Sequence, residues 1–211
     1  MAKLIRWIWP AVNLILVLSC GPRPQGIPET GSISVTDDPW QETVGSADPV
    51  RIQASGYDIT INPVAEYELS ALVLGRRNYG SGWTAAISPC DLAVAWGKMV
   101  ITGLHQRVSW SQSGRWYYWR YREDFPFDNS FISRYSANVH AIPANHNLRA
   151  ALLRIGSGDT ISLHGYLVRI NAYKDGEHYW WNSSLSRNDT GDGSCEVMYI
   201  EEIRHRGMMY R

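Results

Sequence analysis

Two runs of aromatic and β-branched residues, 159–173 and 178–185, constrain the fold most, because only Lys174-Asp175-Gly176-Glu177 separates them. An Asp-Gly pair supplies the positive φ angles of a two-residue type I′ turn. Runs of this composition are typical of strands. The pattern therefore predicts a long β-hairpin in which Lys174 faces Glu177.

Further runs have the same composition, and Ser113-Gly114 predicts a second hairpin between two of them. With so many strands joined by short connections, the chain is expected to form an antiparallel sheet. These runs are 51–54, 57–62, 65–74, 106–112, 115–122 and 195–203.

Two short helices are indicated by the residues at their starts. In SPCDLAVAWGKM, Ser88 has the position of an N-cap, Pro89 the first helical position, and apolar residues then recur at helical spacing up to Met99. In NHNLRAALLRIG, Asn145 precedes a similar apolar face that ends at Gly156. Because each helix is apolar on one face only, each is expected to cover a sheet.

The expected fold class is α+β, with a mainly antiparallel twisted sheet or a partly closed OB-like barrel and two short covering helices. Partial closure of the sheet is favoured by the order of the elements: a strand, a helix and then the strand GDTISLHGYLV, which contains Gly165 in its interior. A glycine at such a position allows a strand to bend sharply.

The N-terminus has the pattern of an export signal. Lys3 and Arg6 form a basic start, and the apolar run that follows ends at Leu18, short of the roughly 20 apolar residues that span a bilayer. The next residues complete Val17-Leu18-Ser19-Cys20-Gly21, which resembles the lipobox of bacterial lipoproteins. The resemblance implies that Cys20 receives a diacylglyceryl group and holds the protein in the bacterial cell envelope. In such lipoproteins, an aspartate directly after the lipidated cysteine retains the protein in the inner membrane. Gly21 has this position here, so the resemblance implies the outer membrane. An ordinary signal peptide or an uncleaved anchor is the alternative.

Residues 20–49 are rich in Pro, Gly, Ser and Thr and contain few large apolar side chains. Such a composition cannot bury enough surface to offset the entropy of ordering. The chain is therefore expected to have three parts: a signal peptide over 1–19, a lipidated N-terminus and flexible linker over 20–49, and one globular α+β domain over 50–211.

Charge and cysteine content limit the partners. The chain has 20 basic and 20 acidic residues. Two of the basic residues, Lys3 and Arg6, are removed with the signal, so the mature chain stays close to neutral. Nucleic-acid binders need a basic face, so no nucleic-acid partner is expected, and no motif indicates a cofactor. Besides Cys20, the chain has Cys90 and Cys195, which are expected to form a disulfide in an oxidising compartment.

Aromatic side chains are the candidate binding groups. In RWYYWRYR, the alternation of a strand places Tyr117, Trp119 and Tyr121 on one face and Trp116, Tyr118, Arg120 and Arg122 on the other. A sheet usually buries one face, so some rings are expected to remain exposed; the alternative is that both faces are covered. Exposed rings beside arginines suit a glycan, a peptide or a protein partner. The candidate binding residues are Trp116, Trp119, Arg120, Arg122, Trp180 and Trp181.

An exported hydrolase is the alternative function. It would pair His140 with a serine, or with Cys90 or Cys195 as a reduced thiol. However, SANVHAIPA around His140 alternates like a buried strand, and no Gly-x-Ser-x-Gly motif is present. The single Asp189-Thr190-Gly191 triplet lacks the apolar flank and the second copy of an aspartic protease. The serines considered are Ser183, Ser184 and Ser186.

A calcium site is a weaker alternative. Asn188, Asp189, Asp192 and Glu196 place oxygen atoms in one short stretch, as a hard cation requires. These are also the residues that tight turns use, and the histidines show no zinc-binding spacing. We therefore expect Trp181–Cys195 to be a structural loop without a metal.

Five segments resemble a group of uncharacterised bacterial exported proteins: SPCDLAVAWG, WSQSGRWYYWRY, YSANVHAIPA, GDTISLHGYLV and WNSSLSRNDTGDGSCE. The resemblance extends from Ser88 to Ile203 and implies one integrated domain, without an activity. The expected function is that of a membrane-anchored envelope lipoprotein whose domain binds a cell-wall glycan, a peptide or another envelope protein without catalysis.

Overall fold

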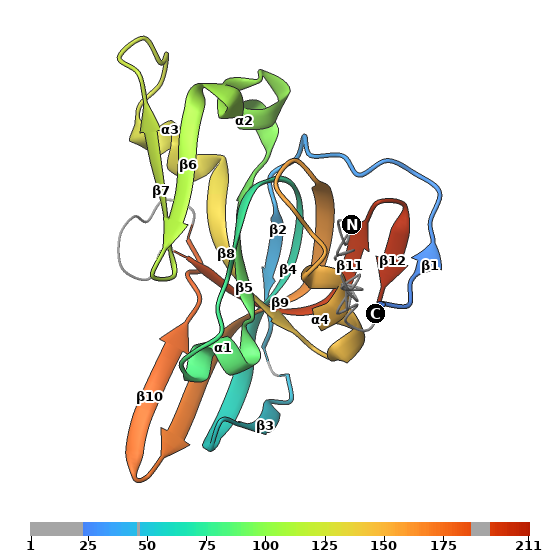
Figure 1. Cartoon of the computed structure of the whole chain (residues 1–211), viewed down its shortest axis with the longest axis vertical. Helices are drawn as coiled ribbons and strands as arrows, with labels where there is room; N and C mark the ends of the chain where they lie inside the picture. Colours follow the sequence, from blue (N-terminus) through green and yellow to red (C-terminus); the bar gives the residue numbers. More distant parts are fainter. Residues whose placement is uncertain (1–22, 46, 187–194) are drawn as a thin grey trace, which may run out of the picture.

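A ring of paired strands forms the centre of the protein (Figure 1). The computed structural model describes residues 23–45, 47–186 and 195–211. Neighbouring strands in the ring follow the order β4, β5, β8, β11 and β9, and β9 pairs back with β4. The bounds are β4 (Tyr57–Asn78), β5 (Cys90–Ala95), β8 (Ser136–Pro143), β9 (Thr160–Lys174) and β11 (Glu196–His205).

The ring is not a regular barrel. Its β8–β11 pair is parallel, whereas the other pairs are antiparallel. The first part of β4, from Asp58, pairs with the end of β9 outside the ring, where β3 (Val50–Ala54) and β10 (Glu177–Asn182) flank the two strands. The predicted α+β class with a mainly antiparallel, partly closed sheet is confirmed.

A separate two-stranded sheet stands beside the ring (Figure 1). It consists of β6 (Val108–Ser113) and β7 (Trp116–Tyr121), and Ser113 pairs with Trp116 across the turn. The loop residues are therefore Gly114 and Arg115, both with positive φ, one position later than the predicted Ser113-Gly114. The predicted Asp175-Gly176 turn is confirmed, because Lys174 pairs with Glu177 across it.

Short helices cover the sheet: α1 (Trp83–Ile87), α2 (Gly97–Ile101), η1 (Leu104–Arg107), α3 (Asn129–Arg134) and α4 (His146–Leu152). The predicted second helix is confirmed as α4, since the Asn145 side chain accepts a hydrogen bond from Leu148 N at 2.9 Å. No helix in the described part of the chain is long and apolar enough to cross a membrane.

The predicted helix over 88–99 is wrong. Residues 90–95 form β5, which is buried along its whole length between β4 and β8. A strand buried on both faces has a continuous apolar run, so its periodicity does not distinguish it from a buried helix. Only the end of the segment is helical, in α2.

The core inside the ring is apolar and includes side chains from α4. Leu148 and Leu152 of that helix are fully buried against residues such as Leu92, Val139 and Ile200. A second cluster of buried apolar side chains lies under α1 and includes residues of β4 and β9. A third cluster lies under α2 and the β6–β7 hairpin.

At Gly165, β9 lies very close to β11. A Cβ atom at this position would lie 2.0 Å from the carbonyl oxygen of Tyr199, so no other residue fits without moving the backbone. The ring can therefore close at this point only because residue 165 has no side chain. This close approach to β11 is a different role from the strand bend predicted for Gly165 from the sequence.

The flexible linker predicted over 20–49 is corrected for its described residues. β1 (Ile27–Pro28) pairs with β12 (Met208–Tyr210), and β2 (Trp40–Thr43) pairs with β4. Backbone hydrogen bonds from other elements order this segment despite its low apolar content, a contribution that composition does not reveal.

Candidate functional site

The outer face of the β6–β7 hairpin exposes aromatic and cationic side chains that the sequence predicted as binding groups. Trp116, Tyr118 and Arg120 lie on β7 directly opposite Ser113, Ser111 and Ser109 of β6. Directly opposite residues in an antiparallel pair share a face, so a row of hydroxyl groups runs beside a row of rings and a guanidinium. Tyr118 is 51% exposed, and the Arg122 side chain, just after β7, is 91% exposed.

The inner face of the same hairpin is packed. Tyr117 stacks parallel to Trp110 and also contacts Trp119. The indole N–H of Trp119 donates to Asn129 Oδ1 at 2.9 Å. Of the four candidates on this hairpin, Trp119 therefore belongs to the packed face, and Trp116, Arg120 and Arg122 belong to the outer face.

The two tryptophans of β10 point to opposite sides, as successive residues of a strand do. Trp180 is 68% exposed. Trp181 is half-buried: it packs edge-on against Trp83, and its ring centroid lies 4.8 Å from that of His140. Trp181 also lies under Arg115, with the guanidinium carbon 5.3 Å from the ring centroid. The structure therefore brings Trp181, but not Trp180, to the turn of the β6–β7 hairpin.

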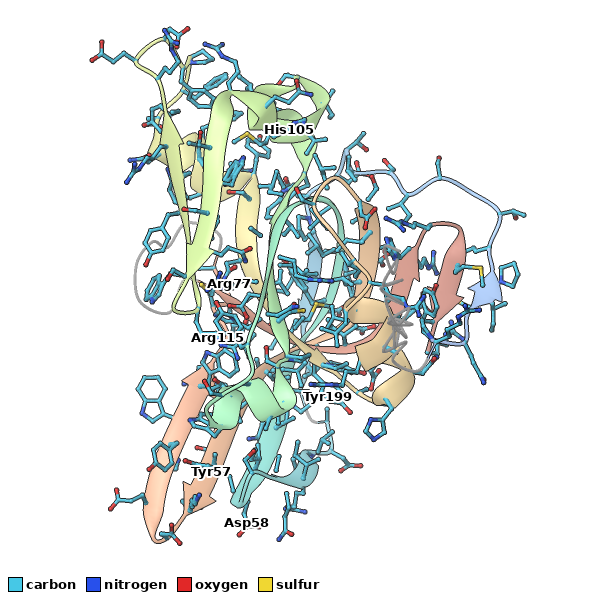
Figure 2. The ribbon with its side chains drawn as sticks, in the orientation of Figure 1. Tyr57, Asp58, Arg77, His105, Arg115 and Tyr199 are labelled. Atoms are coloured by element: carbon cyan, nitrogen blue, oxygen red, sulfur yellow. The ribbon has the colours of Figure 1, made fainter. Side chains whose placement is uncertain are left out.

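Arg115 is the central residue of this junction, where the hairpin turn meets α1 and the end of β10 (Figure 2). Its guanidinium is 2.6 Å from Asp91 Oδ1 on β5 and donates to Ser88 O at 2.9 Å. The same group lies 3.8 Å from the ring centroid of Tyr79. Its backbone N–H donates to the Tyr79 hydroxyl at 3.0 Å. These contacts hold a non-glycine residue at φ 72, a conformation that is costly for a side chain.

Tyr79 is protonated at this junction. Burial and the neighbouring Asp91 carboxylate raise the pKa of Tyr79, because both disfavour a second negative charge. The ring also forms a wall of a groove of about 380 Å³ beside α1, together with Tyr57, Trp83 and Arg149.

Polar contacts continue along the hairpin and attach it to β8. Gln112 Nε2 donates to Asn138 Oδ1 at 2.9 Å, and Asn138 Nδ2 donates to the carbonyl of Arg115 at 2.9 Å. Tyr117 lies with its hydroxyl near Ser136, and burial raises its pKa. The hairpin is thus fixed to the ring by hydrogen bonds and an ion pair as well as by apolar packing.

The geometry does not support the hydrolase alternative. His140 is buried on β8, as the strand pattern indicates, with Nδ1 3.0 Å from Asp91 Oδ1 at ion-pair distance but without hydrogen-bond geometry. Ser183 Oγ donates to the carbonyl of Ser184, and Ser184 Oγ donates to that of Ser186. Within the described residues, no hydrogen bond joins His140 to a serine or a cysteine, as the pairing of a base with a nucleophile would require.

The predicted disulfide is wrong, because Cys90 and Cys195 are separate buried thiols. Cys90 lies on β5 and Cys195 precedes β11, while β8 lies between these two strands. Two strand spacings amount to about 9–10 Å, beyond the roughly 7 Å that a disulfide can bridge. Burial raises the pKa of the Cys90 thiol to about 12, which also argues against its use as a nucleophile.

Most of the remaining sequence candidates lie outside the described residues. Cys20, Asn188, Asp189 and Asp192 are not among the described residues, whereas Glu196 begins β11. The described ranges contain no group of His, Cys, Asp or Glu side chains that could hold a metal ion.

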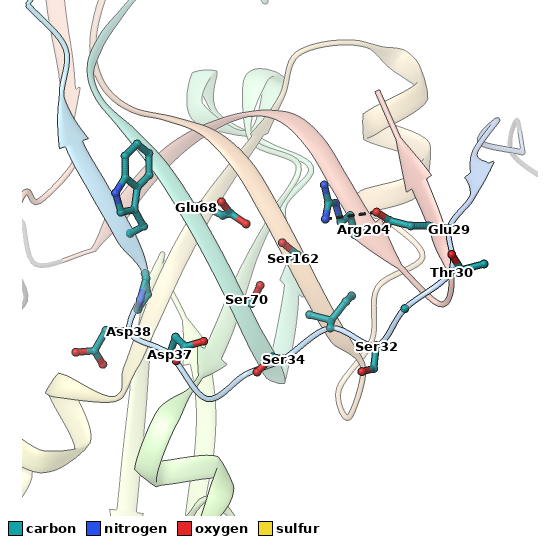
Figure 3. Close-up of a pocket in the computed structure, with 14 residues that line it drawn as sticks. Glu29, Thr30, Ser32, Ser34, Asp37, Asp38, Glu68, Ser70, Ser162 and Arg204 are labelled. Carbon is teal, nitrogen blue, oxygen red and sulfur yellow. Dashed lines mark ion pairs between the residues drawn. The ribbon is translucent and has the colours of Figure 1, made fainter.

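A charged groove of about 420 Å³ lies between the N-terminal segment and the sheet (Figure 3). The segment from Glu29 to Trp40 crosses over β4, β9 and β11. Arg204 on the floor pairs with Glu29 of the segment at 3.4 Å and with Glu202 at 2.8 Å. The ion pair between Arg204 and Glu29 therefore holds the segment on the sheet.

Sequence reasoning missed Arg115, Asp91 and Tyr79. The signal was present for Asp91, which is the one charged residue in the apolar run CDLAVAW. A carboxylate buried in a strand needs a cation, whereas the same residue was interpreted as part of a helix start. Arg115 had no signal, because its partners come from distant parts of the chain.

Comparisons with protein-family models, curated proteins and solved structures find no match to this chain.

Proposed function

We propose that this protein is a lipid-anchored lipoprotein of the bacterial cell envelope whose domain binds cell-wall glycan without catalysis. The lipobox-like sequence ending at Cys20 supports the anchor, and Gly21 favours the outer membrane. The outer face of the β6–β7 hairpin supports the binding role, and its pairing of serines with Trp116, Tyr118 and Arg120 is the observation that carries the proposal.

This face suits a polar polymer for a physical reason. A sugar ring has apolar C–H faces that pack on an aromatic ring, and hydroxyl groups at its edge that need hydrogen-bond partners. Tyr118 and Trp116 offer the ring surface, and the serines of β6 offer hydroxyl groups beside it. Arg120 and Arg122 add charge-assisted hydrogen bonds to carboxylates, which cell-wall glycans and their peptides contain.

The face is also rigid. The inner side of the hairpin is packed, and Arg115 fixes its turn to Asp91. A surface that is already ordered loses little entropy when it binds a ligand. The hairpin therefore presents its outer face in one conformation.

The test is co-sedimentation of the purified domain, residues 23–211, with insoluble cell-wall glycan. The double variant Trp116→Ala/Tyr118→Ala is expected to weaken binding at least tenfold. The control is Trp40→Ala, which removes an equally large ring, 47% exposed, from β2 outside the face. Equal binding by the double variant and the wild type, or an equal loss in the control, would contradict the proposed surface.

A further inference from the structure

The N-terminal segment is attached to the domain very close to the proposed lipid anchor. Gln25 N donates to Asn147 Oδ1 at 2.7 Å, and Asn147 Nδ2 donates back to Gln25 O at 2.8 Å. Asn147 Nδ2 also donates to Arg211 O at 2.9 Å. Asn147 of α4 thereby joins the segment at Gln25 to Arg211, which directly follows the last strand.

Backbone pairing continues this attachment. Ile27 pairs with Met209, and Glu29 N donates to Gly207 O at 2.9 Å. The segment is therefore not a long leash. Only four residues lie between Cys20 and Gln25, and the five steps from one to the other span at most about 18 Å even when the chain is fully extended.

We infer that the short connection holds one defined face of the domain, formed by β1, β12 and the start of α4, against the phospholipid surface in which Cys20 is anchored. This inference rests on the proposed lipidation of Cys20. A domain of this size cannot rotate freely on a connection of about 18 Å, so the side to which Gln25 is fixed faces the lipid headgroups.

The exposed side chains of this face suit a headgroup surface. Ile27 is 60% exposed, and His146 is exposed beside Asn147. The side chains of Arg206 and Arg211 are 70% and 67% exposed, and each is also paired with a partly buried carboxylate, Asp159 and Glu202 respectively. Arginines with a few apolar side chains are favourable at an anionic membrane surface, where each cation near the surface is attracted to it.

The same geometry directs the proposed binding face away from the membrane. β12, β1 and the C-terminus lie at one side of the molecule, and the β6–β7 hairpin and the end of β10 lie at the other (Figure 1). Ile161 of β9 pairs with His205, next to β12, and Tyr173 lies near the other end of β9. At about 3.3 Å per residue, the strand between them has a length of roughly 40 Å along its path, which is the most that it can span. The hairpins therefore extend from the membrane toward the cell wall.

The test measures the accessibility of single cysteines in the full lipidated protein, reconstituted in vesicles of phosphatidylethanolamine and phosphatidylglycerol. Ile27→Cys and His146→Cys report on the inferred membrane face, and Tyr118→Cys and Trp180→Cys report on the opposite side. The native thiols of Cys90 and Cys195 can remain because they are buried. The measurement is the labelling rate by a bulky maleimide polymer in vesicles compared with the rate in detergent.

Labelling at 27 and 146 is expected to slow at least tenfold in vesicles, while the rates at 118 and 180 change less than twofold. Insertion of twenty Gly and Ser residues after Pro22 should restore the rates at 27 and 146. Equal rates at all four positions in a protein shown by mass to be lipidated would overturn the orientation alone. Protection that persists with the inserted linker would overturn the short connection as its cause. Absence of lipid on Cys20 would overturn the anchor itself, and with it this inference.

Discussion

Arg115 reaches from the turn of the β6–β7 hairpin to within 2.6 Å of the Asp91 carboxylate, which is completely buried on β5. The pair joins two elements that are otherwise in separate sheets. A buried carboxylate without a cation is costly. The position of the hairpin, and with it the orientation of the proposed binding face, therefore depends on this contact.

Replacement of Arg115 by alanine should lower the free energy of unfolding by about 3–5 kcal/mol, because it leaves Asp91 buried without its cation. Urea unfolding measures the change. The matched control is Arg120→Ala, which removes an exposed arginine of the same hairpin and should change stability by no more than about 0.5 kcal/mol. A similar small change in both variants would show that the ion pair does not hold the hairpin.

Gly165→Ala should destabilise the protein severely, because the new Cβ would lie 2.0 Å from the carbonyl oxygen of Tyr199. Relief requires β9 and β11 to separate, which opens the ring. We expect a loss of more than about 4 kcal/mol, the range that marks a backbone clash, measured by thermal or urea unfolding. Gly80→Ala is the control, since nothing lies within 4 Å of a Cβ there. Wild-type stability in Gly165→Ala would mean that the two strands are not in close contact.

Stability should fall in acid because two partly buried carboxylates are bound by cations. Burial alone would raise the pKa of Asp159, but hydrogen bonds from Gly156 N and Arg206, together with the His205 imidazole 3.0 Å from the carboxylate, outweigh it and lower that pKa below the ordinary 3.8. Hydrogen bonds from Arg211 and Arg204 likewise lower the pKa of Glu202 below 4.5, against the effect of burial. The unfolded chain therefore binds protons more readily than the folded one, so this stabilisation is present above these ordinary values and is lost as the pH falls below them.

Urea unfolding as a function of pH measures this loss. Glu202→Gln should flatten the dependence between about pH 5 and pH 3, because it removes one of the linked protons. The control is Glu177→Gln, an exposed residue beside the β9–β10 turn. An unchanged slope in Glu202→Gln would rule out Glu202 as a source of the acid sensitivity.

Cys90 and Cys195 should both be recovered as thiols. In the folded protein at pH 8, iodoacetamide should leave Cys90 unmodified, because it is fully buried and its pKa is raised to about 12. Unfolding without a reductant should make both residues reactive. Mass spectrometry of the digest counts the modified cysteines, and a linked 90–195 peptide would contradict the structure.

The sequence predicted those elements whose structure is determined locally. The Asp175-Gly176 turn, the Asn145 cap of α4 and the strand around His140 depend on residues near each feature, and all three are present. The alternation along β7 was also predicted correctly, since the structure packs Trp119 and exposes Arg120.

Features that depend on distant contacts could not be predicted in this way. β5 resembles a helix in sequence because it is buried on both sides, between β4 and β8. The hairpin turn is shifted by one residue because Tyr79 and Asp91 hold Arg115 at positive φ. The segment around Ile27 is ordered by hydrogen bonds to β12, which is far away in the sequence.

The most direct measurement of the central claim is photo-crosslinking in living cells with benzoylphenylalanine in place of Tyr118. We expect an adduct of high and heterogeneous mass that collapses to the mass of the protein when the cell wall is digested with a muramidase. The same probe in place of Trp40, outside the binding face, should give no such adduct. An adduct of one discrete mass that resists the muramidase, or an adduct at position 40 and none at 118, would contradict glycan binding by the outer face of the β6–β7 hairpin.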